Sequence, residues 1–170
     1  MPRKRFIVPW TGSEEKPALY HCVSRIVDRR FALGQDEKEQ FRSYMRMYEK
    51  FTGCRVLTYC LMCNHLYLLM EVTPRPEGGL TDAQLLERVR AISLPATVSL
   101  LRKELKEARE KLAAGLVNAE YVEKIHARYT YRMHDLSEFM KGVMQRFCLR
   151  STPATPSVRA SSGARFQLAA

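Results

Sequence analysis

The chain has 170 residues, which is the usual size of a single domain. Hydrophobic residues make up 46% and charged residues 27% of it, so it can bury a core, and the stretch from Met1 to Arg150 is neither disordered nor a small disulfide scaffold. No apolar run approaches the roughly 18–20 residues of a membrane helix. The charged N-terminus lacks the apolar segment of a secretory signal. These features predict a globular, cytoplasmic protein with no membrane partner.

The chain is strongly basic, with 28 lysines and arginines against 18 acidic residues and a net charge of +10. Such an excess attracts polyanions, and nucleic acid is the commonest polyanion in the cytoplasm. An ordinary basic protein is the alternative. Two groups of side chains are candidates for contacts with DNA phosphates, although each could instead serve solubility: Arg3, Lys4 and Arg5, and Arg25, Arg29 and Arg30.

The cysteines do not indicate a disulfide framework or a zinc site. There are five of them, an odd number, and only Cys60 and Cys63 have the Cys-x-x-Cys spacing. No second Cys or His pair follows at a spacing that zinc would need. Because both lie in an apolar, strand-like run, we expect them to be buried thiols.

Residues 17–72 predict a strand, a helix and two further strands. The segment 18–27 is rich in β-branched and aromatic residues, as strands are. Asp36, with a glutamate three residues on, predicts a capping box, and Gly53 predicts the end of the helix. Segments 55–62 and 65–72 then predict two strands joined by a tight turn. Their continuous hydrophobicity favours central positions in the sheet.

Residues 81–132 predict helices after a loop at 74–79 that is rich in Pro and Gly. Thr81 and Asp82 offer N-cap chemistry, and Pro95 follows a break. In the longest helix, four small or apolar residues share one face: Leu101, Leu105, Ala108 and Leu112. Its other face is expected to be solvated, with ion pairs Glu104–Arg109 and Lys106–Glu110.

A last helix is predicted at 137–149, with Asp135 as its cap and a broad apolar face that includes Met140 and Met144. Beyond it, residues 151–170 predict a disordered tail, since 14 of the 20 are Ser, Thr, Pro, Ala or Gly and none is acidic.

The string Leu61-Met-Cys-Asn-His-Leu-Tyr-Leu-Leu-Met70 carries the clearest chemical signal. In a strand, His65 and Tyr67 project from one face, and Leu66 and Leu68 from the other. Two histidines at this spacing would present two imidazoles to one divalent metal. Here Tyr67 fills the second position, so only half of that arrangement is present. A structural, hydrogen-bonded role for His65 is the alternative.

This string resembles the Met-x-Asn-His-x-His-Leu-Leu signature of the single-tyrosine transposases of the HUH superfamily, which include the REP-associated tyrosine transposases. The likeness extends to Tyr20-His-Cys-Val-Ser-Arg25, to Arg29-Arg-Phe31 and to a late helix with Gln145-Arg-Phe147. It implies an α+β, ferredoxin-like domain over residues 1–150, with an antiparallel sheet and a helical insertion at about 74–133.

The resemblance also implies an enzyme that nicks and rejoins single-stranded hairpin DNA through a phosphotyrosine, works as a homodimer and holds Mg²⁺ or Mn²⁺. Carried onto this chain, the catalytic position is the degenerate pair His65 and Tyr67, with His65 as the remaining metal ligand. A phenol is a poor ligand for a hard cation, which predicts weak metal binding.

The family's continuation, with its nucleophilic tyrosine, does not follow Arg150. Tyr121, Tyr129 and Tyr131 match no family motif, so no nucleophile is assigned. A shifted reading frame offers one origin for the tail. Read one base later, codons for the family-like Phe-Asn-Ala-Arg-His-Ala encode Ser-Thr-Pro-Ala-Thr-Pro, the residues from Ser151 to Pro156. The tail is therefore interpreted as a frame-shifted remnant, with an unrelated disordered tail as the alternative.

Together these patterns predict a DNA-binding protein of the transposase family that has lost strand cleavage. A different class of function stays open, in which the helical segment from Thr81 to Met133 binds a protein partner and DNA plays no part.

Overall fold

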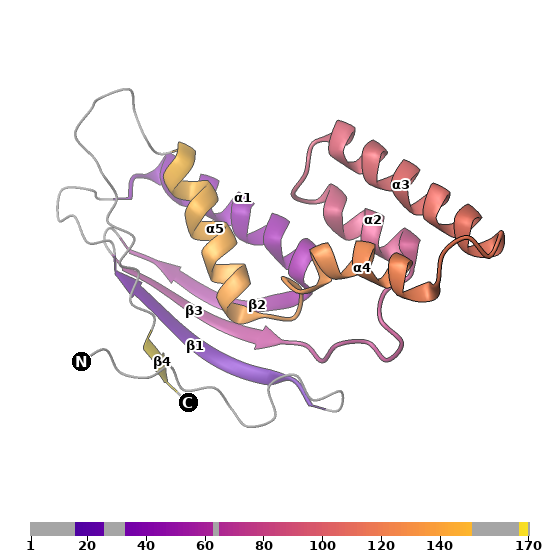
Figure 1. Cartoon of the computed structure of the whole chain (residues 1–170). Coiled ribbons are helices and arrows are strands. Elements are labelled where there is room, and N and C mark those ends of the chain that lie inside the picture. Colours follow the sequence, from indigo (N-terminus) through magenta and orange to yellow (C-terminus); the bar gives the residue numbers. More distant parts are fainter. Residues whose placement is uncertain (1–15, 26–32, 63–64, 151–166, 170) are drawn as a thin grey trace, which may run out of the picture.

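The computed structural model describes residues 16–25, 33–62, 65–150 and 167–169. Figure 1 shows an α+β protein in which the helices lie on one side of a sheet. The elements, in chain order, are β1 (Ala18–Arg25), α1 (Gln35–Thr52), β2 (Cys54–Leu61), β3 (His65–Val72), α2 (Asp82–Arg90), α3 (Pro95–Ala113), α4 (Ala119–Thr130), α5 (Leu136–Arg150) and β4 (Gln167–Ala169).

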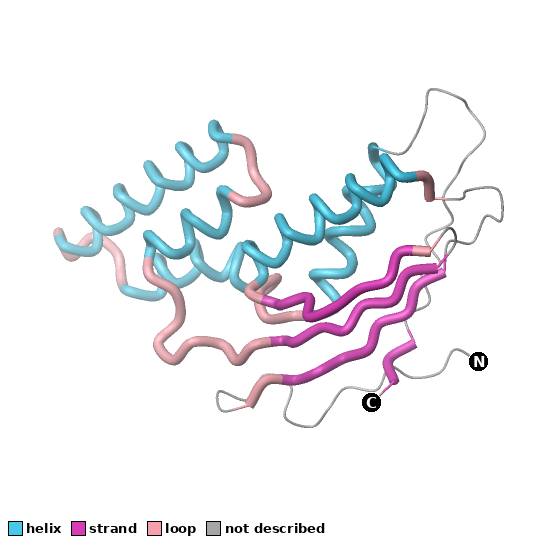
Figure 2. The backbone as a smooth tube through the Cα atoms, turned by 180° about the vertical axis from the view of Figure 1, so that it is seen from behind, coloured by secondary structure: helices cyan, strands magenta, loops and turns pink. Residues whose placement is uncertain are grey.

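The sheet is antiparallel, with the order β2-β3-β1-β4. Leaving out α2, α3 and α4, the chain follows the β-α-β-β-α-β order of a ferredoxin-like fold. The predicted fold class is therefore confirmed, and the three extra helices stand between β3 and α5 in the chain. Figure 2 shows the same layers from behind, with the helices on one side of the strands. Part of the predicted tail, Gln167–Ala169, pairs with β1 as β4. Composition did not predict this strand because a three-residue pairing depends on the partner strand.

β3 lies between two strands as predicted, but the central position expected for the segment 55–62 is wrong. In the described sheet, β2 is an edge strand. Its pairing with β3 shifts between Val56 and Thr58, and this irregularity leaves Leu57 46% exposed. The apolar run looked continuous because a bulge interrupts the alternation of buried and exposed residues.

The inward faces of β1 and β3 build the core. The buried residues alternate along each strand: Ala18, Tyr20, Cys22 and Ser24 on β1, and Leu66, Leu68, Met70 and Val72 on β3. Helices α1 and α5 cover this face and meet through edge-to-face aromatic pairs. The ring centroids are 5.4 Å apart in Phe41–Phe147 and 6.5 Å apart in Tyr48–Phe139.

Helix α5 approaches α1 closely because Gly142 has no side chain. A methyl group at this position would lie 2.2 Å from Cε1 of Tyr48. The Tyr48 ring is itself held edge-to-face by Phe51 and Phe139, so it cannot move aside freely. On the same helix, Met140 is buried and Met144 is packed at the edge of the core, which confirms the predicted core role of these methionines.

Gly142→Ala should destabilise the fold by about 1–3 kcal/mol, the usual cost of overpacking a core. In an unobstructed helix interior the same change would stabilise by about 0.5–1 kcal/mol, so the sign is diagnostic. The free energy of unfolding in urea measures it. Gln145→Ala, at an exposed position of α5, is the control and should change stability by less than about 0.5 kcal/mol. A stabilised Gly142→Ala protein would contradict the close packing of α5 on α1.

The helices begin and end where the sequence predicts, except at the start of α1. Gly53 ends α1 in the left-handed conformation, with φ 76°, and Asp135 accepts a hydrogen bond from the Glu138 amide at 2.9 Å. The expected N-cap at Asp36 is wrong: Gly34 occupies that position, and Asp36 lies in the first turn. An acidic side chain there is still favourable, because it faces the positive end of the helix dipole.

The helical insertion begins with a capping box formed by Thr81 and Gln84, and Pro95 opens α3. The predicted apolar face of α3 is buried, with Leu112 packed at its margin. The predicted pair Glu104–Arg109 is wrong. Glu104 pairs with Arg128 of α4, and Arg109 pairs with Asp82 of α2, so these charges join helices. Lys106 and Glu110 do pair, at 3.9 Å.

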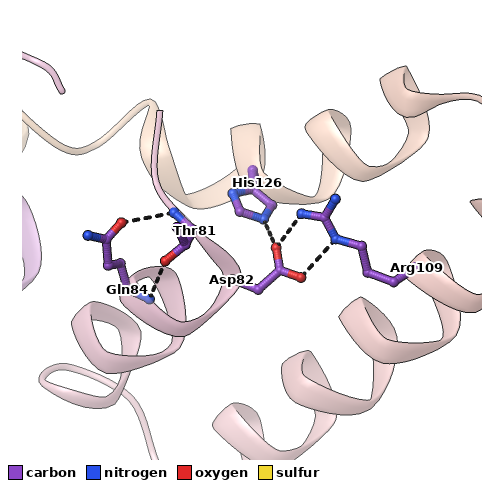
Figure 3. A network of polar contacts seen from close by, with 5 residues as sticks. All are labelled: Thr81, Asp82, Gln84, Arg109 and His126. Atoms are coloured by element: carbon purple, nitrogen blue, oxygen red, sulfur yellow. Dashed lines mark hydrogen bonds and ion pairs between the residues drawn. The ribbon is translucent and has the colours of Figure 1, made fainter. Parts of the chain in front are cut away.

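Asp82 connects all three helices of the insertion (Figure 3). Its Oδ1 lies 2.7 Å from Nε2 of His126 on α4, and Arg109 on α3 donates to both carboxylate oxygens at 2.7 and 2.9 Å. Hydrogen bonds from Arg109 lower the pKa of Asp82, with His126 adding to the effect. The three contacts hold the ends of α2, α3 and α4 in one arrangement.

Asp82→Asn should lower the free energy of unfolding by about 1–2 kcal/mol at pH 7, because hydrogen bonds to a charged partner are lost. Since folding lowers the pKa of Asp82, its contribution is present above the unfolded pKa, near 3.8, and is lost as the pH falls through the folded pKa. The gap between wild type and variant should therefore close in acid. Glu110→Gln, which affects an exposed pair, should cost less than about 0.5 kcal/mol. Equal losses in the two variants would contradict the role of Asp82.

A second polar cluster joins the insertion to the sheet. His134 has φ 54°, and its amide donates to the Thr52 carbonyl at 2.8 Å. Its Nδ1 lies 3.0 Å from the Thr73 carbonyl oxygen, and Arg88 of α2 lies 3.3 Å from its Nε2. Burial lowers the pKa of His134, which favours the neutral ring beside the Arg88 guanidinium. The end of α1, the end of β3 and α2 thus meet at one histidine.

Candidate nucleic-acid interface

One face of the sheet carries no described helix. The five described helices lie on the opposite side (Figure 1). The face that carries no described helix is formed by the side chains of β1 and β3 that alternate with the core residues. On β3 these are His65, Tyr67, Leu69 and Glu71, and on β1 they include Leu19, His21 and Val23. We call this surface the open face.

His65 and Tyr67 lie on the open face together, as the alternation predicted. Their ring centroids are 6.3 Å apart and their planes differ by 19°. Tyr67 also stacks with His21 of β1, with centroids 6.0 Å apart and planes 18° apart. His65 and Tyr67 are neighbours on one face of β3, and the pairing of His21 with Leu69 places His21 diagonally from Tyr67, so Tyr67 lies in the middle. We call His21, Tyr67 and His65 the aromatic row.

The residues beside His65 do not fit a divalent metal site. The second imidazole of this face, His21, stands beyond the Tyr67 ring, so the two histidines do not converge on one point. Within the described ranges, no group of three His, Cys, Asp or Glu side chains could hold a metal ion. A phenol replaces neither imidazole nor carboxylate as a ligand for Mg²⁺ or Mn²⁺. Of the expected ligands, only His65 is present at this position.

All eight tyrosines lie in the described part of the chain, and Tyr67 is the one on the open face. Tyr20, Tyr44 and Tyr48 are buried in the core, and Tyr59 of β2 points toward α1, where Arg42 lies over its ring. The remaining three are on α4 or directly after it: Tyr121, Tyr129 and Tyr131. Helix α4 lies on the side of the sheet opposite the open face (Figure 1).

Cys60 is exposed, and the expectation that it is a buried thiol is wrong. It pairs with Tyr67 across β2 and β3 and so borders the aromatic row. The error has the same cause as the misplaced β2, since the bulge reverses which residues face outward. Cys63 lies outside the described residues. Among the described cysteines, Cys22 and Cys54 are buried, and burial raises their pKa to about 12 and about 11.

The charges on the open face do not repel a polyanion. Glu71 is the one carboxylate among the described outward side chains of β1, β2 and β3, and Arg55 pairs with it at 2.8 Å. The backbone of Arg25 pairs with that of His65. The other candidate phosphate contacts lie outside the described residues: Arg3, Lys4, Arg5, Arg29 and Arg30.

Sequence reasoning did not select His21 as a site residue. Alternation alone would place it outward, opposite the buried Tyr20 and Cys22. Its contact with Tyr67, however, depends on the register between β1 and β3, which are separated by a helix and a strand in the sequence. A cross-strand register of this kind is set by packing and not by local pattern.

Comparison with family models identifies a family for this fold and this site. Residues 16–115 match the model described as transposase IS200-like, and the chain belongs to that family. The matched range includes β1, α1, β2, β3, α2 and α3. Comparison with curated proteins and with solved structures gave no match. In the described part of the chain, no helix is both long and apolar enough to cross a membrane.

Proposed function

We propose that this transposase-family protein binds single-stranded or hairpin DNA and does not cleave it. The proposal rests on the identity of residue 67. Tyr67 lies two residues after His65 on the open face, and its ring stacks on the imidazole of His65. The family resemblance assigns this position to a second metal-binding imidazole. An aromatic ring at this position offers a surface that DNA can contact, but it does not supply the metal ligand that cleavage needs.

Loss of cleavage follows from the demands of the chemistry. A bound cation stabilises charge on the phosphate being attacked, and this requires a site that holds the cation in place. Beside His65, this chain offers a phenol where the resemblance implies a second ligand. Removing one of the few protein ligands of a metal weakens its binding severely, so His65 alone is a poor substitute for the pair.

The nucleophile is the second missing part. An attacking tyrosine must stand in line with the phosphorus, close to the groups that stabilise the transition state. Seven of the eight tyrosines lie in the core or on the helix side of the sheet. The eighth, Tyr67, is packed between two imidazole rings. These positions support the proposal that the chain binds DNA but places no tyrosine in line with the phosphorus of a bound strand.

Binding would rest on the positive charge of the chain. With a net charge of +10, the chain attracts the phosphate backbone whatever its sequence. The proposed phosphate contacts are Arg3, Lys4, Arg5, Arg25, Arg29 and Arg30. The proposal also includes a cytoplasmic location and a homodimer, the latter on the family resemblance alone.

Affinity for a single-stranded hairpin should therefore fall steeply with salt, with a slope of about −0.7 per phosphate contact on a log–log plot. Arg29→Ala with Arg30→Ala should flatten the slope by one to two contacts. Fluorescence anisotropy over a series of salt concentrations measures both. Arg102→Ala with Lys103→Ala, on the exposed surface of α3, removes the same charge and should leave the slope unchanged. Affinity independent of salt, or no binding at low salt, would contradict the proposal.

The same hairpin, labelled and incubated with Mg²⁺ or Mn²⁺, should give no denaturant-stable protein–DNA adduct on a gel. Tyr67→His alone should improve metal binding yet still give no adduct, because no tyrosine stands beside the site. A covalent adduct from the unmodified chain, mapped to any tyrosine by mass spectrometry, would overturn the loss of cleavage.

A further inference from the structure

The open face carries aromatic rings next to exposed leucines. Leu19 is 54% and Leu69 is 36% exposed, and the one described carboxylate nearby is paired with Arg55. His21 is exposed, and Tyr67 and His65 are half-buried. This is an unusual use of an uncovered sheet face, since a solvated face normally carries charged and polar side chains.

The two ring pairs of the aromatic row have similar centroid distances and similar angles between their planes. Tyr67 lies 6.0 Å from His21 and 6.3 Å from His65 between ring centroids, and each pair of planes is parallel to within 20°. The rings come from two adjacent strands that are paired along their full length, so the sheet holds them in fixed positions. The row therefore places three nearly parallel rings side by side on one face of the sheet.

We propose that His21, Tyr67 and His65 form a stacking platform for the unpaired bases of single-stranded DNA. Aromatic side chains on neighbouring strands of an open sheet stack two or three bases in other single-strand binding folds. Every base has a π-face, so such binding tolerates any sequence and excludes a duplex, whose bases are already stacked. This inference rests on the proposed function and names the part of the DNA that the open face contacts.

The basic character of the chain favours this occupant over an apolar protein segment. A net charge of +10 concentrates nucleic acid at the surface, and the open face adds no unpaired described carboxylate to oppose it. Phosphate contacts then give salt-dependent affinity, and the aromatic row adds a contribution that depends on the bases. The two contributions are separable by experiment.

The test compares a 20-nucleotide oligothymidine with an abasic strand of the same length, measured by fluorescence anisotropy on the full chain. Wild type should bind oligothymidine more tightly. Tyr67→Leu should weaken that binding about 5- to 100-fold, the range for loss of one base stack, and leave the abasic strand unaffected. Tyr67→Phe, which keeps the ring, should retain the affinity for oligothymidine. Tyr131→Leu, at an exposed tyrosine beyond α4, is the matched control and should change neither.

Cys60 provides a second readout that needs no substitution. It is exposed and pairs with Tyr67, so oligothymidine seated on the aromatic row should slow its alkylation. Tandem mass spectrometry assigns the modified cysteine. Cys148 of α5, on the other side of the sheet, should react at the same rate with and without DNA. If circular dichroism shows that Tyr67→Leu does not fold, the protection of Cys60 from alkylation in the wild-type chain tests the stacking platform instead.

The outcomes separate the platform from the proposed function. If wild type binds both strands equally, or if Tyr67→Leu binds oligothymidine as wild type does, the platform is wrong and salt-dependent DNA binding stands. If Cys60 is not protected while DNA is bound, the DNA lies elsewhere and the platform is again wrong. If wild type binds neither strand at low salt, the proposed function and the stacking platform are both wrong.

Discussion

The alternation of side chains along β3 is the constraint on which the rest of the structure depends. Leu66, Leu68 and Met70 are fully buried on one face, and His65 and Tyr67 stand on the other. Because β3 pairs with a strand on each side, a slip of β3 by one residue would expose three large apolar side chains and bury His65 and Tyr67. The hydrophobic core thus fixes the direction in which the site residues point.

The helices depend on the same strand. Helices α1 and α5 cover the buried side of the sheet, and the close approach at Gly142 brings them together over it. The insertion is attached where β3 ends, through His134, Thr73 and Arg88, and Asp82 then holds α2, α3 and α4 together. This arrangement keeps every described helix away from the open face (Figure 1).

Much of the fold was predictable because its signals are local. Gly53, Thr81 and Asp135 each end or begin a helix through backbone chemistry that acts within a few residues. The errors arise where a longer-range contact decides. Glu104 and Arg109 have a plausible spacing on one helix, yet each forms its ion pair with a residue of a neighbouring helix. The bulge in β2 reverses the facing of Cys60, and no local pattern signals it.

The candidate site was also predictable only in part. That His65 and Tyr67 share a face was predictable from the period of a strand. The third ring, His21, reaches them through the register of two strands that are distant in the sequence, and the sequence does not specify that register. Membership of the IS200-like transposase family supplies the context in which Tyr67 matters, since the resemblance places a second imidazole at this position.

The central claim is that Tyr67 makes this site an aromatic surface and not a metal centre. Electron paramagnetic resonance during a Mn²⁺ titration tests it most directly, in wild type, Tyr67→His and Tyr67→His with His65→Ala. The account predicts that Tyr67→His binds Mn²⁺ at least about 10-fold more tightly than wild type, and that removing His65 abolishes the gain. Wild-type binding as tight as that of Tyr67→His, and lost in His65→Ala alone, would contradict it.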